Sequence, residues 1–146
     1  MKRNERIMNL PRFDDLRVDD TLPPLTLPGI SRKTLALYAG ASADHHPLHI
    51  DLDYAREAGM SDVFAHGMLS AAYLGRLLTD WVPQERLRDF SVRFTGITQL
   101  HSIPHCVGRV VGKFEHNGET CVRVALSCAN QHGEEKLVGE AVVALD

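Results

Sequence analysis

Residues 67–80, GMLSAAYLGRLLTD, form the most hydrophobic helical segment of the chain. Apolar side chains occur on nearly every side of a helix through this segment: Met68, Leu69, Ala71, Ala72, Tyr73, Leu74, Leu77 and Leu78. A helix that is apolar nearly all round has to be covered by other elements on most sides. Its small residues, Gly67, Ser70 and Gly75 among them, let other backbone approach closely. The segment therefore predicts a long buried helix around which the rest of the chain is organised.

The hydrophobic pattern changes to a period of two after Asp89, which indicates strands. Alternation occurs in four segments: residues 90–95, 107–114, 122–128 and 137–145. Asn117-Gly118 is a strong signal for a two-residue hairpin, and His132-Gly133 marks a second hairpin. We expect an antiparallel meander of four strands, curved around the helix so that the helix is buried.

Two further helices are predicted before the buried one. Ser31 is a suitable N-cap for an amphipathic helix over residues 32–42. A helix of one to two turns follows, capped by Asp51 or Asp53 and ended by Gly59. The first helix delivers the chain to the segment that carries the chemistry.

A chain of 146 residues is expected to form a single domain, residues 1–146. Residues 1–9 carry no structural signal and are expected to be loosely ordered. Pro23-Pro24 restrict any strand within residues 21–27 to a sheet edge. Helices followed by an antiparallel sheet place the chain in the α+β class.

Composition and charge exclude several classes of function. Hydrophobic residues make up 44% and charged residues 24%, which is ordinary for a globular protein. The net charge of −3 gives no bulk attraction to nucleic acid or to an anionic membrane. No stretch approaches the roughly 18 apolar residues of a membrane span, and the start has no signal-peptide pattern. We expect a cytoplasmic protein with reduced, mostly buried cysteines: Cys106, Cys121 and Cys128.

Residues 44–49, DHHPLH, set a carboxylate and an imidazole five residues apart across a proline. Pro47 disfavours helix at His46, so we expect a loop that turns both end side chains to one point. Such a pair, within reach of one water, can act as acid and base, each contributing about 10²–10⁴-fold. Residues 66–68, HGM, open the buried helix seventeen residues after this motif.

The motifs DxHPLH at residues 44–49 and AHGM at residues 65–68 resemble the hydratase signature of the MaoC-like dehydratases, the (R)-specific enoyl-CoA hydratases. The resemblance covers about residues 20–145. It implies the hot-dog fold, a curved antiparallel β-sheet wrapped around a long central α-helix. This expectation agrees with the pattern of helix and strands described above.

The resemblance also implies roles for the motif residues. Asp44 and His49 are expected to be catalytic and to add water reversibly to a trans-2-enoyl-CoA. The free backbone N–H of Gly67, at the first turn of the helix, is a suitable donor to the thioester oxyanion. The remaining motif residues are expected to contact substrate: His46, Pro47, His66 and Met68. No cofactor and no metal is expected.

One position departs from the family pattern, which has asparagine where this chain has His46. A ring nitrogen of His46 can orient the water or the catalytic histidine in its place. Alternatively, His46 changes the acidity of the pair or reshapes the pocket. Two simpler interpretations of the motif also stay open. Asp44 and His49 can be a structural pair capping the helix of residues 32–42, or His45 and His49 can be metal ligands, although Pro47 between them argues against helix.

The expected partner is an acyl-CoA or acyl-carrier-protein thioester, with no nucleic acid and no membrane. A hot-dog subunit offers half of a binding cleft, so we expect a homodimer or higher homo-oligomer, or a heterodimer with a related hot-dog subunit. Two other functions remain open: a hot-dog acyl-CoA thioesterase, and a non-catalytic subunit of a heteromeric dehydratase.

Overall fold

The computed structural model describes residues 10–146, so the expectation for residues 1–9 lies outside the described residues. Five strands form one antiparallel sheet in the order β1-β3-β4-β5-β2. The strands are β1 (Leu25–Thr26), β2 (Leu87–Phe94), β3 (His105–His116), β4 (Glu119–Ala129) and β5 (Glu135–Ala144). The helices are α1 (Arg32–Ser42), α2 (Leu52–Glu57) and α3 (Gly67–Trp81), with short 3₁₀ turns η1 (Phe13–Asp15), η2 (Pro47–His49) and η3 (Gln84–Arg86).

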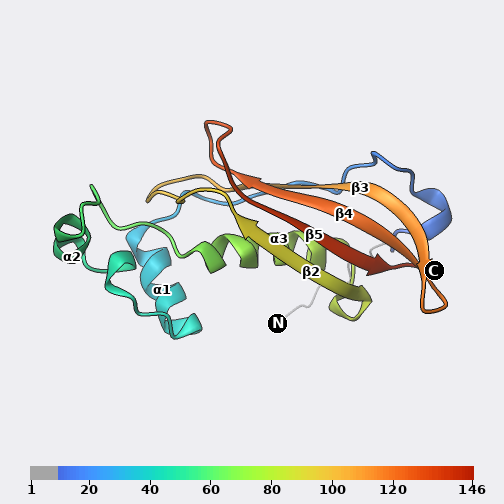
Figure 1. The fold of residues 1–146 in the computed structure, drawn as a ribbon, viewed down its shortest axis with the longest axis horizontal. Coiled ribbons are helices and arrows are strands. Elements are labelled where there is room, and N and C mark those ends of the chain that lie inside the picture. The colour runs from blue at the N-terminus through green and yellow to red at the C-terminus, as the bar shows by residue number, and fades with distance from the viewer. Residues whose placement is uncertain (1–9) are drawn as a thin grey trace, which may run out of the picture.

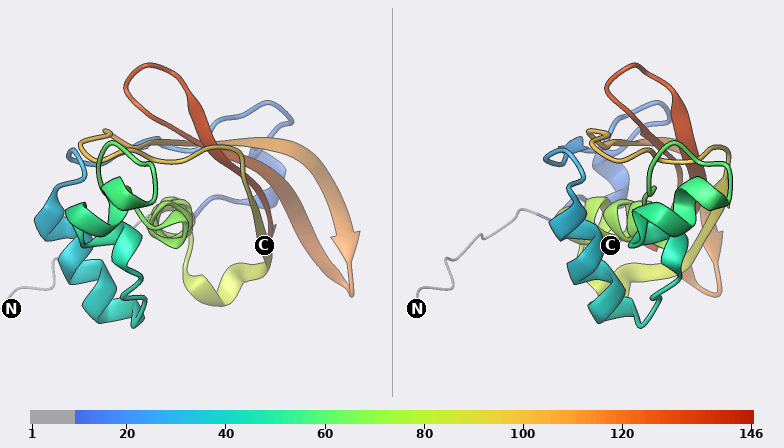
Figure 2. Two further views of the ribbon diagram at one scale, coloured as in Figure 1. Left: turned by 60° about the vertical axis from the view of Figure 1, so that its left-hand side comes forward. Right: turned by 90° about the vertical axis from the view of Figure 1, so that its left-hand side faces the viewer.

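The sheet curves around α3, which lies against its concave face (Figure 1). A view close to the axis of α3 shows the strands bending over the helix and down one side of it (Figure 2). Leu74 and Leu78 of α3 are fully buried and belong to one cluster with Val110 of β3 and Val124 of β4. Burying a large aliphatic side chain contributes about 1.5–3 kcal/mol. The predicted curved sheet around a central helix is thus confirmed.

The predicted four-strand meander is wrong in the place of its first strand. β3, β4 and β5 do follow one another as hairpins, and Asn117 (φ 53°) and Gly118 (φ 78°) form the expected tight turn. β2, however, pairs with β5 at the opposite edge, as in Phe90 opposite Ala141. Residues 95–104 between β2 and β3 contain no hairpin signal and are long enough to cross the sheet. The pattern predicted the strands, but not which neighbour the first one selects.

The helices before α3 form as their end signals predict. Ser31 Oγ accepts the N–H of Thr34 at 3.1 Å, and the Thr34 hydroxyl accepts the N–H of Ser31 at 3.4 Å. This reciprocal capping box satisfies two free N-terminal donors of α1. Asp51 caps α2 by accepting from the N–H groups of Asp53 and Tyr54. Both short helices lie at the end of the molecule where α3 begins (Figure 1).

Three further expectations concern the cysteines, the membrane and the edge of the sheet. Cys106, Cys121 and Cys128 are free and buried in the sheet, as expected for core thiols. Across residues 10–146, no helix has both the length and the apolar character that a membrane crossing requires. The predicted edge strand is also present, because β1 is the first strand in the sheet order of the described part of the chain and pairs there with β3.

Candidate active site

Asp44 lies in the loop that leaves α1. Ala43 adopts a left-handed backbone conformation (φ 59°), which ends the helix. The N–H of Asp44 donates to Ser42 Oγ at 3.2 Å, and Asp44 Oδ1 accepts the N–H of His46 at 3.2 Å. The side chain is exposed and does not cap α1. One carboxylate oxygen therefore holds the loop, and the exposure of the side chain leaves the other accessible to a ligand.

His49 ends the 3₁₀ turn η2, and its ring is oriented by a backbone carbonyl. The Nδ1 atom lies 2.8 Å from the carbonyl oxygen of Phe64. Because a carbonyl can only accept, Nδ1 carries the proton and Nε2 is left unprotonated in the neutral ring. Phe64 is itself held by a β-bridge to Gln99. The turn and the bridge thus present Nε2 of His49 as a proton acceptor.

His66 lies beneath this ring and is only 1% exposed. Its imidazole stacks on that of His49, with ring centroids 4.0 Å apart and an angle of 26° between planes. Its Nε2–H donates to the backbone carbonyl of Asp44 at 3.0 Å. The ring of Tyr38 also packs against it at a steep angle, with ring centroids 4.8 Å apart. His66 therefore connects the carboxylate loop, the imidazole and the start of α3.

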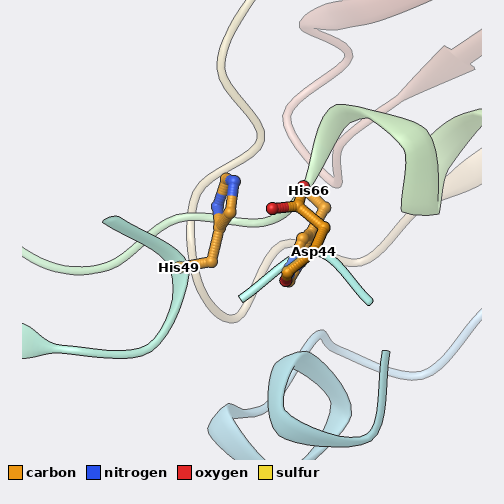
Figure 3. Close-up of side chains that lie close together, drawn as sticks. All are labelled: Asp44, His49 and His66. Atoms are coloured by element: carbon orange, nitrogen blue, oxygen red, sulfur yellow. The ribbon is translucent and has the colours of Figure 1, made fainter. Parts of the chain in front are cut away.

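Polar atoms of Asp44, His49 and His66 all lie within 4.8 Å of one another. Figure 3 shows the carboxylate of Asp44 directed toward the ring of His49. The carboxylate comes from the loop after α1 and the imidazole from η2, so the proline-containing loop turns both side chains to one point. A water or a small polar group held there can exchange protons with either side chain.

Gly67 is the first residue of α3, and its N–H belongs to the helix end that lacks intrahelical acceptors. The positive end of the helix dipole adds to the attraction for an anionic oxygen. A Cβ placed on Gly67 would lie 2.7 Å from Cε1 of Phe94, so the aromatic ring packs directly on this glycine. Met68, 56% exposed, is the next residue on the same turn. This end of α3 is apolar at its sides and carries a free donor at its tip.

The other motif residues have different positions. His46 Nδ1 accepts the N–H of Leu48 at 3.2 Å, so the ring closes the turn before His49 and is not directed at the carboxylate. Pro47 is the first residue of η2 and is half-buried, at a position where its missing N–H costs nothing. His46 and His66 both form hydrogen bonds within the protein, and their contact with substrate stays a prediction. Pro47 and Met68 remain proposed contacts of the substrate.

The same three side chains meet the spacing of a metal site, but their orientation does not suit one. An ion lies close to the plane of each imidazole that binds it, about 2.0–2.1 Å from the nitrogen for zinc. The rings of His49 and His66 are nearly parallel at 4.0 Å, so one ion cannot lie in both planes. In addition, Nε2 of His66 already donates to the Asp44 carbonyl. The geometry fits an acid/base pair on a histidine support.

The buried His66 predicts an acid-sensitive stability. Burial lowers the pKa of His66, the hydrogen bond to the Asp44 carbonyl opposes this, and His49 lowers the pKa further. The unfolded chain therefore binds a proton in a pH range where the folded chain does not. Stability is complete above the unfolded histidine pKa of about 6.5 and falls as the pH drops from there toward the folded pKa.

The measurement is denaturant unfolding of the wild type and of His66→Gln at pH 7.5 and pH 5.5, at one protein concentration. Glutamine can donate to the Asp44 carbonyl but does not titrate. We expect the wild type to lose more stability than the variant over this interval. Equal losses would show that His66 is not held neutral by burial.

Sequence reasoning missed several of the contacts that hold the site. The carbonyl of Phe64 orients His49, the ring of Tyr38 supports His66, and Phe94 covers Gly67. Every residue has a carbonyl, so no residue type marks the one that is used. The alternating pattern places Phe94 in a strand, but it does not indicate that this strand ends beside Gly67.

Comparison with known proteins was consistent with this description. The family model of the MaoC-like domain matches residues 17–131. The fatty acid synthase beta subunit TOXC of Cochliobolus carbonum is 30% identical over 112 residues, which is 73% of this chain but only 5% of that protein. The mitochondrial 3-hydroxyacyl-[acyl-carrier-protein] dehydratase of Arabidopsis thaliana is 26% identical over 131 residues, covering 89% of this chain and 78% of the plant protein.

Solved structures give the same result. The unliganded R-hydratase PhaJ1 of Pseudomonas aeruginosa superposes with a TM-score of 0.80 at 28% identity, covering 92% of this chain and 86% of that one. The ChsH1–ChsH2 complex of Mycobacterium tuberculosis contains a chain with a TM-score of 0.75 at 20% identity, covering 89% of this chain and 98% of that one. The second likeness shows the fold alone.

The fold and the site together define a hot-dog protein with a carboxylate–imidazole pair at the N-terminal end of its central helix. The chain belongs to the MaoC-like domain family. Its relatives and structural neighbours include hydratases and dehydratases of acyl thioesters. The resemblance and the fold predicted from the motifs are thereby confirmed.

Proposed function

We propose that the chain is an (R)-specific enoyl-thioester hydratase, which adds water reversibly to a trans-2-enoyl-CoA to give the (R)-3-hydroxyacyl-CoA. The observation that carries this proposal is the Asp44 carboxylate facing the His49 ring beside the start of α3. The hydratase and dehydratase relatives support the reaction class. The (R) stereochemistry rests on the likeness to the R-hydratase structures.

The proton balance of hydration indicates what Asp44 and His49 do in the proposed reaction. Hydration puts OH on C3 and H on C2 of the enoyl group, with no net change in the enzyme. His49 offers an unprotonated Nε2, and Asp44 offers a free carboxylate oxygen. Because the enzyme ends as it began, the proton that the pair takes from water is balanced by the proton that C2 receives. The pair therefore acts as a shuttle, with the proton moving from water through Asp44 or His49 to C2.

The negative charge that develops during attack at C3 lies on the thioester oxygen. In our proposal the N–H of Gly67 donates to that oxygen, with the α3 dipole behind it. The acyl chain then extends along apolar surface near Met68 and Phe94, both about half exposed. Pro47, in the turn before His49, is a proposed contact on the other side. No cofactor takes part in this mechanism.

The test is an assay of the purified protein with crotonyl-CoA and with longer trans-2-enoyl-CoA substrates. We expect 3-hydroxyacyl-CoA to form and no free thiol to be released. Release of free thiol from saturated butyryl-CoA would instead identify a thioesterase. Absence of both reactions alone, with hydration restored by a co-expressed hot-dog partner, would identify this chain as one subunit of a heteromeric enzyme.

We also propose at least a dimer. Within residues 10–146, β2 is an edge strand that pairs with β5 alone, and an edge strand is a template for pairing with another chain. Phe90, Phe94 and Met68 expose 39%, 51% and 56% of their surface around β2 and the start of α3. A second copy, or a related subunit as in the ChsH1–ChsH2 complex, would cover this apolar face and complete the cleft.

Light scattering at micromolar concentration measures this prediction directly. We expect at least twice the mass of 16.2 kDa, and a shift toward monomer in Phe90→Asp. Val18→Asp is the matched control, because Val18 is also an exposed apolar residue, at 51%. Its neighbour Asp19 donates its N–H to the carbonyl of Val110 in β3, a strand separated from β2 by β4 and β5. A monomeric wild type would contradict the proposal.

A further inference from the structure

His46 occupies the N-cap of the turn that carries His49. Its backbone is extended enough (φ −58°, ψ 129°) to precede the 3₁₀ turn, and its Nδ1 accepts the N–H of Leu48 at 3.2 Å. The N–H of His46 donates in turn to the carboxylate of Asp44 at 3.2 Å. His46 is therefore bonded on one side to the carboxylate and on the other to the turn that ends in the imidazole.

This cap has a property that the usual capping residues lack. A nitrogen that accepts a hydrogen bond must be unprotonated, and imidazole is the side chain that changes charge between about pH 5 and 8. The carbonyl oxygen of asparagine, the residue of the family pattern, accepts without titrating in this range. Protonation of His46 at Nδ1 would place two N–H groups against each other and release Leu48.

We propose that His46 is a positioning residue whose neutral ring holds the His49 turn in place and whose protonation releases it. The position of the His49 ring would then depend on pH through the protonation of His46. The structural part of this inference stands on the hydrogen bonds of His46 alone. Its consequence for turnover rests on the proposed hydratase function.

Other groups around His46 bear on its charge. The rings of His49 and Tyr54 each lie 6.1 Å from it, centroid to centroid, and Asp44 and His45 precede it in the loop. Charged residues on the cap and body of the adjacent helix α2 are Asp51, Asp53, Arg56 and Glu57. Protonation of His49 lowers turnover by itself, so a comparison with a variant is needed.

The first experiment needs no substrate. Nuclear magnetic resonance follows the Leu48 amide and the His46 ring of the free protein from pH 8 to pH 5.5. We expect the Leu48 amide shifts to change with the same midpoint as the His46 ring, and to lose that transition in His46→Asn. His45→Asn is the control, because no hydrogen bond of the His45 side chain is present within residues 10–146. Leu48 amide shifts that stay constant while the His46 ring titrates would overturn the proposal.

The second experiment measures kcat/KM for crotonyl-CoA over the same pH range. Loss of a helix cap lowers the population of the capped turn by about threefold to tenfold. We therefore expect the kcat/KM of His46→Asn, divided by that of the wild type, to rise by about this factor from pH 8 to pH 5.5. The ratio for His45→Asn stays flat. A flat ratio for His46→Asn would overturn the positioning role. Absent hydration at every pH, with the Leu48 transition intact, would overturn only the proposed function.

Discussion

Asp44→Asn is expected to lower turnover of crotonyl-CoA by about 10²–10⁴-fold, the usual contribution of a positioned acid or base. The substitution is nearly isosteric, and the amide oxygen can still accept the N–H of His46 that the carboxylate accepts at 3.2 Å. The loop is therefore retained while the proton acceptor is lost. Asp53→Asn, an exposed carboxylate in the first turn of α2, is the matched control and should keep wild-type turnover.

His49→Ala is expected to give a loss of the same order, because it removes the other half of the shuttle. The two losses should not add in the double variant, since either substitution alone interrupts one proton path. His45→Ala removes a neighbouring imidazole that is exposed and serves as the control. Thermal unfolding of each variant separates loss of chemistry from loss of fold. Wild-type turnover in both Asp44→Asn and His49→Ala would remove these residues from the mechanism.

The second large effect is expected at Gly67. The methyl group of Gly67→Ala would lie 2.7 Å from Cε1 and 3.0 Å from Cδ1 of Phe94, so the ring has to move. Phe94 is 51% exposed and can swing outward, so we expect little loss of stability. The methyl group would occupy the helix end where the thioester carbonyl is proposed to bind. Since a misplacement of about 1 Å can cost about 10²-fold, kcat/KM should fall by about tenfold to a hundredfold.

Gly75→Ala is the matched control on the same helix. A Cβ there meets nothing closer than Cε1 of Phe90 at 3.8 Å, an ordinary contact. Adding Phe94→Ala to Gly67→Ala distinguishes two causes of the loss. If the methyl group blocks the thioester, the double variant stays slow. Full recovery to the rate of Phe94→Ala alone would mean that only the displaced ring mattered, and would contradict the oxyanion role of Gly67.

Local signals predicted the helices well because the physics that ends a helix is local. Ser31 and the residues after it set the start of α1, and α1 covers the predicted residues 32–42. The Asn117-Gly118 turn likewise formed where expected. The partner of β2 was predicted wrongly, because strand pairing across ten intervening residues depends on the tertiary fold. No residue between Phe94 and His105 indicates that β2 pairs with β5 and not with β3.

For the site, the sequence predicted which side chains to examine but not how they are held. Asp44 and His49 follow from the motif and the bend at Pro47, and the structure places them together. The stacking of His66 on His49 and its bond to the Asp44 carbonyl depend on the fold that returns residue 66 to residue 44. The role of His46 as a cap required coordinates, since its sequence position allowed several roles.

The proposed reaction moves one proton from water to C2 while hydroxide adds at C3. Its most direct test is the reaction with crotonyl-CoA in deuterated water, stopped at low conversion and analysed by mass spectrometry and chiral separation. We predict (R)-3-hydroxybutyryl-CoA with one carbon-bound deuterium, at C2, and far less of this product with Asp44→Asn. Crotonate and free coenzyme A without any 3-hydroxy product would contradict it.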